Sequence, residues 1–411
     1  MVRMFEVYGR RHGGSERAMR RGVRGVLRAG APAVCAALLA AGCTGAGGGG
    51  AGVATPAERS ATAVPSPPKP SASATAPAVA AKGSVTTGRT VATELKTPWG
   101  VAPLPGGDLL VGSRDDGTIT RVDGRSGRLT PVGEVSGVEP GGEGGLLGLA
   151  LSPDFAADHL VYAYFTTASD NRIARLIYDE RRPSGQQLGA PDTILRGIPK
   201  GLIHNGGRIA FGPDRMLYAG TGETGNGDLA QDKASLGGKI LRMTPDGEPV
   251  HGNPEADSVV YSYGHRNVQG LAWDAEHRLW AAEFGQNRYD ELNLIEPGRN
   301  YGWPVVEGRA GRPGYRDPVA QWTTEEASPS GIAYAQGAIW MAGLRGQRLW
   351  RVPLDGARAA AAPQAFLERR FGRLRTVLAT GPDGLLLSTS NTDGRGSPRP
   401  GDDRIVELTV R

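Results

Sequence analysis

A turn rich in Gly, Asp or Pro, followed by a short apolar strand, recurs six times along most of the chain. The apolar runs lie at intervals of 46 to 62 residues, near Leu109, Leu160, Leu217, Leu279, Ile339 and Leu385. Short strands between turns, repeated at this rough period, are typical of a β-propeller. A β-sandwich would not require so many approximate copies, so we expect an all-β, six-bladed β-propeller. The last apolar strand, residues 404–410, could pair near residues 90–95 and close the ring.

The first 90 residues differ from the remainder in charge. The chain of 411 residues carries a net charge of +5, the first 90 residues contribute +9, and residues 91–411 therefore carry −4. A nucleic-acid site needs a cluster of positive charge on the folded part. We therefore expect no nucleic acid among the partners of this chain.

Residues 1–43 have the layout of an export signal. An Arg-rich start precedes an apolar run at residues 31–41, which is too short for a stable transmembrane anchor. The small residues before Cys43 resemble a bacterial lipobox, so we expect a cleaved signal peptide and a lipid on Cys43 that anchors the exported protein to the cell membrane. A signal peptide with an incidental cysteine is the alternative.

Residues 44–90 consist mainly of Gly, Ala, Ser, Thr and Pro. Such a segment cannot bury enough apolar surface to offset the loss of chain entropy, so we expect a disordered linker. The folded domain is then expected to span residues 91–411. Both cysteines, Cys35 and Cys43, lie outside this domain, which excludes a disulfide or a thiolate metal site within it.

One histidine, His204, lies in a glycine-rich loop directly before an expected strand. The pKa of imidazole suits removal of a proton near neutral pH, so His204 is a candidate general base. A histidine that only stabilises a turn is the alternative at this point.

Three further clusters could bind a ligand. Arg266 and Asn267 offer a guanidinium fork and an amide. Carboxylates beside glycine in residues 283–295 could supply oxygen ligands to calcium, although their spacing is not that of an EF-hand. Arg373 and Arg375, two residues apart on an expected strand, share a face and could bind one anion. Each cluster by itself could also brace a loop or face solvent.

Together these segments resemble the soluble quinoprotein glucose/sorbosone dehydrogenases, which include the bacterial aldose sugar dehydrogenases. The resemblance runs from about Thr97 to Ile405, and its most specific pieces are residues 144–150 (GGLLGLA), 204–207 (HNGG), 264–271 (GHRNVQGL), 290–293 (DELN) and 300–304 (NYGWP). Any one piece could occur by chance, but their common order is specific. Members of the family are six-bladed propellers that use pyrroloquinoline quinone (PQQ) and calcium to oxidise aldose sugars at C1 to the lactone.

The resemblance implies roles for two residues in catalysis. His204 would be the general base that takes the proton of the anomeric hydroxyl, while the hydride passes to C5 of PQQ. Glu223 lies where the family has an acidic partner of this histidine, and a carboxylate there would orient the imidazole. An external acceptor, which the sequence does not identify, would then take the electrons.

The resemblance also implies which residues contact the cofactor. Arg266 and Asn267 match a pair that contacts the quinone, Arg373 and Arg375 match cofactor-binding arginines, and Thr324 matches a cofactor-contacting threonine. PQQ carries three carboxylates, so several guanidinium groups around its rim suit its charge.

Two calcium sites are implied in the same way. Gly285 and Gln286 match backbone carbonyls that hold a calcium ion, which would polarise the C5 carbonyl as a Lewis acid. Glu291 and Tyr301 match ligands of a second, structural calcium.

Two cofactor-site positions depart from the family pattern. Glu143 stands where many relatives have glutamine, and Arg345 stands where relatives often have lysine. Glu143 should repel a polyanionic cofactor unless it is protonated or directed to a metal. Arg345 keeps the positive charge but changes its shape.

Two other functions fit parts of the pattern. A calcium-dependent sugar lactonase would need no quinone and leaves the arginines unexplained. A non-catalytic surface propeller would bind carbohydrate or protein. Convergence of His204, Arg266, Arg373 and Arg375 on one channel mouth would favour the dehydrogenase.

Overall fold

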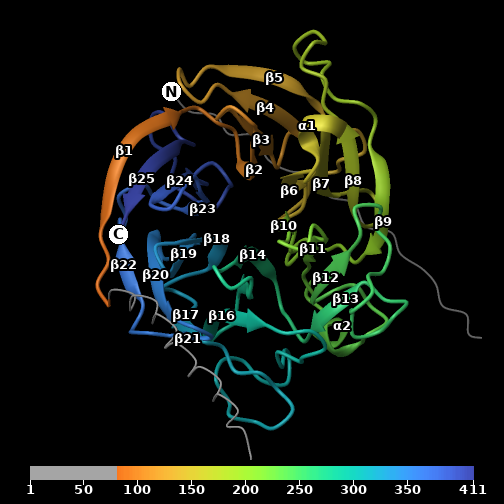
Figure 1. The fold of residues 1–411 in the computed structure, drawn as a ribbon, viewed down its shortest axis with the longest axis vertical. Helices are drawn as coiled ribbons and strands as arrows, with labels where there is room; N and C mark the ends of the chain where they lie inside the picture. The colour runs from red at the N-terminus through yellow and green to blue at the C-terminus, as the bar shows by residue number, and fades with distance from the viewer. Residues whose placement is uncertain (1–80) are drawn as a thin grey trace, which may run out of the picture. The chain divides into compact units, whose positions relative to one another are not determined.

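The computed structural model describes residues 81–411, which form six antiparallel β-sheets arranged in a ring (Figure 1). The expected six-bladed β-propeller is therefore confirmed. The expected signal peptide, Cys43 and most of the expected linker lie outside the described residues.

Each blade has four strands, except that both β21 and β22 pair with β20 in the fifth blade. From the innermost strand outward, the blades are β2 (Pro98–Pro103), β3 (Leu109–Ser113), β4 (Thr118–Val122) and β5 (Leu129–Glu134); β6 (Leu146–Leu151), β7 (Leu160–Thr166), β8 (Asn171–Ile177) and β9 (Asp192–Ile198); β10 (Ile209–Phe211), β11 (Leu217–Gly220), β12 (Lys239–Met243) and β13 (Val260–Tyr263); β14 (Val268–Trp273), β15 (Leu279–Glu283), β16 (Tyr289–Ile295) and β17 (Ala320–Thr323); β18 (Pro329–Ala335), β19 (Ala338–Gly343), β20 (Arg348–Asp355), β21 (Arg358–Ala359) and β22 (Gln364–Phe366); and β23 (Leu374–Ala379), β24 (Gly384–Thr389), β25 (Ile405–Val410) and β1 (Val85–Ala92).

Two short helices, α1 (Phe155–Asp158) and α2 (Asp228–Gln231), lie in connections between strands. Within residues 81–411, no helix has the length and apolar character needed to cross a membrane.

The six apolar runs found in the sequence are the second strands of the six blades, namely β3, β7, β11, β15, β19 and β24. Both faces of these strands are covered, because each blade packs between two neighbours. This explains why they are continuous apolar runs rather than alternating ones. In β15 and β19 every residue is buried, including Trp280 and Trp340.

The ring closes by pairing the two ends of the described chain. β1 pairs antiparallel with β25, from Val85 opposite Val410 to Ala92 opposite Ile405, and becomes the outer strand of the sixth blade. Closure by the last strand was expected, but its partner starts at Val85, earlier than residue 90. Residues 85–90 therefore belong to the propeller, and the expected boundary between linker and domain is six residues too late.

The hydrophobic core consists of six clusters, one between each pair of adjacent blades. Glycines on the innermost strands allow these blades to approach closely. A Cβ at Gly148 in β6 would lie 2.2 Å from the carbonyl oxygen of Gly207, and one at Gly270 in β14 would lie 2.4 Å from that of Ser330. The high glycine content thus serves the packing of inner strands, and the rigid ring positions the loops at its end.

Candidate active site

Loops from all six blades enclose a cavity of about 420 Å³. Nine of the thirteen predicted site residues line it: Glu143, His204, Arg266, Gly285, Gln286, Thr324, Arg345, Arg373 and Arg375. The convergence that would favour the dehydrogenase over the non-catalytic propeller is therefore present. One cavity is lined by His204, Arg266, Arg373 and Arg375. A larger groove of about 650 Å³ runs along the first blade, and none of the predicted residues line it.

His204 and Glu223 form a hydrogen-bonded pair at the cavity wall. Nδ1 of His204 lies 2.7 Å from Oε1 of Glu223, which is almost completely buried. Glu223 lies in the loop after β11 and does not line the cavity, so it contacts the site through the histidine. Because the carboxylate occupies Nδ1, Nε2 is the ring nitrogen left for the cavity.

Asn267 supports the histidine loop from behind. Its Oδ1 accepts the backbone N–H of Gly206 at 2.9 Å, and its side chain is fully buried. Asn267 is outside the cavity lining, whereas the neighbouring Arg266 is part of it. The Arg266 guanidinium lies over the ring of Trp303, and its Nε has no hydrogen-bond partner among the described residues.

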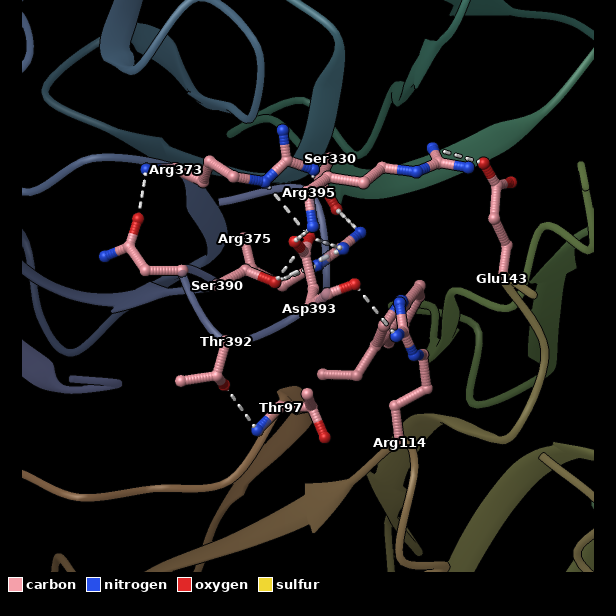
Figure 2. Close-up of polar contacts among 12 residues, drawn as sticks. Thr97, Arg114, Glu143, Ser330, Arg373, Arg375, Ser390, Thr392, Asp393 and Arg395 are labelled. Atoms are coloured by element: carbon pink, nitrogen blue, oxygen red, sulfur yellow. Dashed lines mark hydrogen bonds and ion pairs between the residues drawn. The ribbon is translucent and has the colours of Figure 1, made fainter. Parts of the chain in front are cut away.

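Arg373 and Arg375 share one carboxylate, that of Asp393 (Figure 2). Asp393 Oδ2 lies 2.9 Å from Nη2 of Arg373 and 3.3 Å from Nη2 of Arg375. Burial lowers the pKa of Arg375 to about 9, against the opposing effect of Asp393, and the charges of Arg114 and Arg373 lower it further. Two guanidinium groups on one carboxylate leave a surplus of positive charge in a water-poor site.

A further buried guanidinium, that of Arg208, adds to this surplus. Arg208 lies 4.3 Å from the ring centroid of Trp99, and Arg375 lies 5.8 Å from the same centroid. Burial lowers the pKa of Arg208 to about 9, and Arg208 forms no ion pair among residues 81–411. Its hydrogen bonds run to neutral oxygens, those of Gln269 and Thr376.

Glu143 joins three loops at the cavity mouth. Its Oε2 accepts the backbone N–H of His204 at 2.8 Å, and its Oε1 lies 2.7 Å from Nη1 of Arg395 (Figure 2). Burial raises the pKa of Glu143, but the His204 amide and Arg395 outweigh this and leave the pKa below its usual range. Glu143 is therefore ionised, and its charge is compensated by Arg395. This ion pair reduces the expected repulsion of an anion.

The fourth and fifth blades supply the opposite side of the cavity. Gly285 and Gln286 lie in the turn between β15 and β16, Thr324 follows β17, and Arg345 follows β19. Arg345 is mostly exposed and pairs with Glu325 at 3.1 Å. Asp290, at the start of β16, also lines the cavity and accepts the backbone N–H groups of Gly285 and Ser328.

Glu291 and Tyr301 lie behind this side, around a small adjoining cavity. Burial, followed by the charge of Glu283, raises the pKa of Glu291 to about 8, and burial raises the pKa of Asp290 to about 7. The Tyr301 hydroxyl donates to the Leu294 carbonyl at 2.7 Å. Among residues 81–411, no three His, Cys, Asp or Glu side chains gather in a metal-ligating cluster, so a metal there would depend on backbone oxygens.

Comparison with known families agrees with this geometry. The family described as Glucose / Sorbosone dehydrogenase matches residues 95–397. The chain belongs to this family. The match includes strands of all six blades and, of residues 81–411, leaves out only β1, β25 and the residues next to them.

Among solved structures of similar proteins, the PQQ-bound aldose sugar dehydrogenase from Streptomyces coelicolor is 71% identical, with a TM-score of 0.81 over 81% of this chain and 100% of that chain. The aldose sugar dehydrogenase YliI of Escherichia coli is 28% identical over 74% of this chain and 91% of its own length. Quinoprotein glucose dehydrogenase B of Acinetobacter calcoaceticus is 30% identical over 61% of this chain and 59% of its own length.

Several lining residues were missed by the sequence analysis of this family member, notably Trp99, Arg114, Gln269, Asp393 and Arg395. A positional signal could have found three of them. The segment after the second strand of a blade faces the cavity in most blades: Arg114 directly follows β3, Phe284 follows β15, and Asp393 and Arg395 lie in the loop after β24. The repeat that identifies the blades therefore also identifies where their functional loops begin.

Proposed function

We propose that this chain oxidises aldose sugars at C1 to the lactone, using PQQ and calcium, and passes the electrons to an external acceptor. The observation that carries the proposal is the convergence of His204, Arg266, Arg373 and Arg375 on one cavity. The similarity to the PQQ-bound aldose sugar dehydrogenase of Streptomyces coelicolor supports the use of PQQ and an aldose substrate.

The charge of the cavity fits PQQ. Among residues 81–411, Arg373 and Arg375 share a single carboxylate, Arg208 has none, and Arg266 has only Glu223, whose Oε1 lies 3.9 Å from its Nε and also contacts His204. Buried guanidinium groups in excess of their counterions favour a polyanionic ligand, and PQQ carries three carboxylates. When bound, PQQ supplies the carbon that accepts the hydride from the sugar.

His204 is the proposed general base. In this proposal Nδ1–H of His204 donates a hydrogen bond to the Glu223 carboxylate, which leaves the lone pair on Nε2 for the cavity. Nε2 would take the proton of the anomeric hydroxyl, and Glu223 would stabilise the resulting imidazolium. Glu143 and Asn267 hold the loop of His204 in place through its backbone N–H groups at His204 and Gly206.

Calcium is proposed at two places. The backbone carbonyls of Gly285 and Gln286 would hold one ion at the cavity, and Glu291 and Tyr301 would contribute to a second one behind it. Hard oxygen donors of this kind suit calcium. The buried carboxylates Asp290 and Glu291, whose pKa values are raised by burial, are consistent with a nearby cation.

The proposals for the first part of the chain rest on its sequence alone. Residues 1–43 would direct export and leave a lipid on Cys43, and the following segment up to about residue 84 would link this anchor to the propeller. The expected location is therefore outside the cytoplasm, at the cell membrane.

The test is a dye-linked oxidation assay on the protein purified with calcium, with and without added PQQ, against a panel of aldoses. Dye reduction that requires both PQQ and sugar supports the proposal. Hydrolysis of sugar lactones without PQQ would instead support the lactonase alternative. Sugar binding without PQQ binding or turnover would support the non-catalytic propeller.

A further inference from the structure

Glu307 holds the turn that carries Gly285 and Gln286; it lies outside the main cavity and lines the small adjoining cavity with Glu291 and Tyr301. Its single oxygen Oε1 accepts the backbone N–H groups of four successive residues, Gln286, Asn287, Arg288 and Tyr289, at 2.7, 3.1, 3.0 and 3.2 Å. Glu307 itself lies in the long connection between β16 and β17. Consecutive amides that converge on one anion form a compact backbone concavity, which fixes the conformation of the turn.

The amide before this series is also bound by a carboxylate. The N–H of Gly285 donates to Oδ1 of Asp290 at 2.9 Å. Burial raises the pKa of Glu307, but its four amide contacts outweigh this and leave the pKa below its usual range. Glu307 therefore binds four successive amides as an anion, and Asp290 binds the amide that precedes them.

The direction of the amides determines the direction of the carbonyls. In a trans peptide, the C=O of one residue is antiparallel to the N–H of the next. The N–H groups of Gln286 and Asn287 point to Glu307, so the carbonyls of Gly285 and Gln286 point away from it. Gly285 and Gln286 line the main cavity and Glu307 does not, so we infer that these carbonyls face the main cavity.

The turn has no space for another arrangement at Gly285. A Cβ there would lie 2.0 Å from the Tyr289 carbonyl oxygen and 2.7 Å from Oε1 of Glu307. The next residue after Glu307 also contacts this region, because the N–H of Gly308 donates to Oε1 of Glu291 at 2.7 Å. Glu307 thus contacts the turn, and the adjacent Gly308 contacts the buried carboxylate of Glu291 behind it.

We propose that Glu307 is a positioning residue that presents the carbonyls of Gly285 and Gln286 to the calcium ion of the cavity. This inference rests on the proposed function, which places calcium at these carbonyls. Glu307 is not among the residues that line the main cavity, where this ion and the sugar would bind. It acts through the backbone by neutralising four N–H groups on the side opposite the cavity.

The experiment compares Glu307→Ala and Glu307→Gln with the unmodified protein. Hydrogen–deuterium exchange of the peptide covering residues 285–290 is measured without calcium, and calcium is titrated calorimetrically into PQQ-loaded protein that has been stripped with a chelator. For Glu307→Ala we expect faster exchange confined to this peptide and a calcium Kd raised about 10- to 100-fold, as for other residues that orient metal ligands. Glu307→Gln keeps an acceptor oxygen and should fall between the two.

Asp123→Ala is the matched control, because Oδ1 of Asp123 accepts the backbone N–H groups of Arg125 and Ser126 in a turn of the first blade, away from the cavity. It should leave the calcium Kd unchanged. A calcium Kd within twofold of the unmodified value in Glu307→Ala would overturn the inference alone. No calcium binding by the unmodified PQQ-loaded protein would overturn the proposed calcium site and the inference with it.

Discussion

The two sides of the cavity are built from different groups, guanidinium groups on one side and buried carboxyl groups on the other. On the side formed by the first and sixth blades, Arg373 and Arg375 share one buried carboxylate, that of Asp393, while Arg114 donates to the backbone carbonyl of Asp393 and pairs with Asp115 (Figure 2). On the side of the fourth blade, Asp290, Glu291 and Glu307 form no ion pair with any described residue and contact mainly backbone amides. The first side has more buried guanidinium groups than buried carboxylates, and the carboxyl groups of the second side have no ion-pair partner among residues 81–411.

This difference indicates what the cavity can bind. Buried charges are stable only when they are paired or well hydrogen-bonded. A polyanion on the arginine side and a divalent cation on the carboxylate side would each supply the missing charge. PQQ with calcium meets both requirements in one cavity, and His204 lies at its wall with its own carboxylate partner.

The largest expected effect comes from a residue that contributes to neither side. His204→Asn should lower sugar oxidation by about 100- to 10,000-fold, because it removes the proposed general base. Binding of PQQ and calcium should change little, since the charges of both sides remain. The check is the dye-linked rate at saturating sugar, together with a PQQ titration. An unchanged rate in PQQ-loaded protein would remove the basis of the proposed mechanism.

The next effect tests the single carboxylate of the arginine side. Asp393→Asn should lower the free energy of unfolding without PQQ by about 3 kcal/mol, because it leaves buried guanidinium groups without their counterion. Added PQQ should then raise the melting temperature more than it does in the unmodified protein. Urea and thermal unfolding with and without PQQ provide the measurement. Asp179→Asn, whose partner Arg181 is exposed, is the control; an equal loss in both variants would contradict the comparison.

Removing a cation from the same side should have a smaller effect, and on a different property. Arg375→Met should raise the Kd for PQQ about 10- to 100-fold, which corresponds to the binding free energy of one hydrogen bond to a charged group. Without PQQ, the free energy of unfolding should fall less in Arg375→Met than in Asp393→Asn, because Arg375→Met removes a buried positive charge instead of its counterion. Fluorescence titration of PQQ measures the Kd, and Arg181→Met is the exposed control. If Asp393→Asn and Arg375→Met weaken PQQ binding equally, the surplus of positive charge is not what binds it.

The smallest effect concerns the contact between Glu143 and Arg395 at the mouth. The pKa of Glu143 in the folded protein is below its ordinary value of 4.5, so this carboxylate stabilises the fold above that pH and the contribution is lost as the pH falls through the folded pKa. Glu143→Gln should therefore cost about 1 kcal/mol near pH 7, and the difference from the unmodified protein should vanish in acid. Unfolding free energies between pH 3 and 7 give the result. Glu180→Gln is an exposed control, and a difference that does not depend on pH would contradict the prediction.

Much of the candidate site could be predicted because its residues lie in short, contiguous motifs. His204, the pair Arg266 and Asn267, and the pair Arg373 and Arg375 each stand in a local pattern, and all but Asn267 line the cavity. Their chemical partners could not be predicted in this way. Asp393 and Arg395 lie in a loop with no distinctive motif, and Glu307 lies in a long connection whose path the repeat does not specify.

The sequence by itself determined the six blades, because each blade repeats a local pattern of turns and apolar strands whose two covered faces leave a continuous apolar run. It also determined which loops carry a histidine, a guanidinium pair or glycine-rich backbone. Only the tertiary structure decided that β1 belongs to the sixth blade, that Arg395 reaches Glu143 across 252 residues of sequence, and that one oxygen of Glu307 holds four amides. These contacts depend on how loops of different blades meet around the ring. A pattern along the chain specifies strands and turns, whereas the pairing of charges and amides between distant loops is specified by their positions in space.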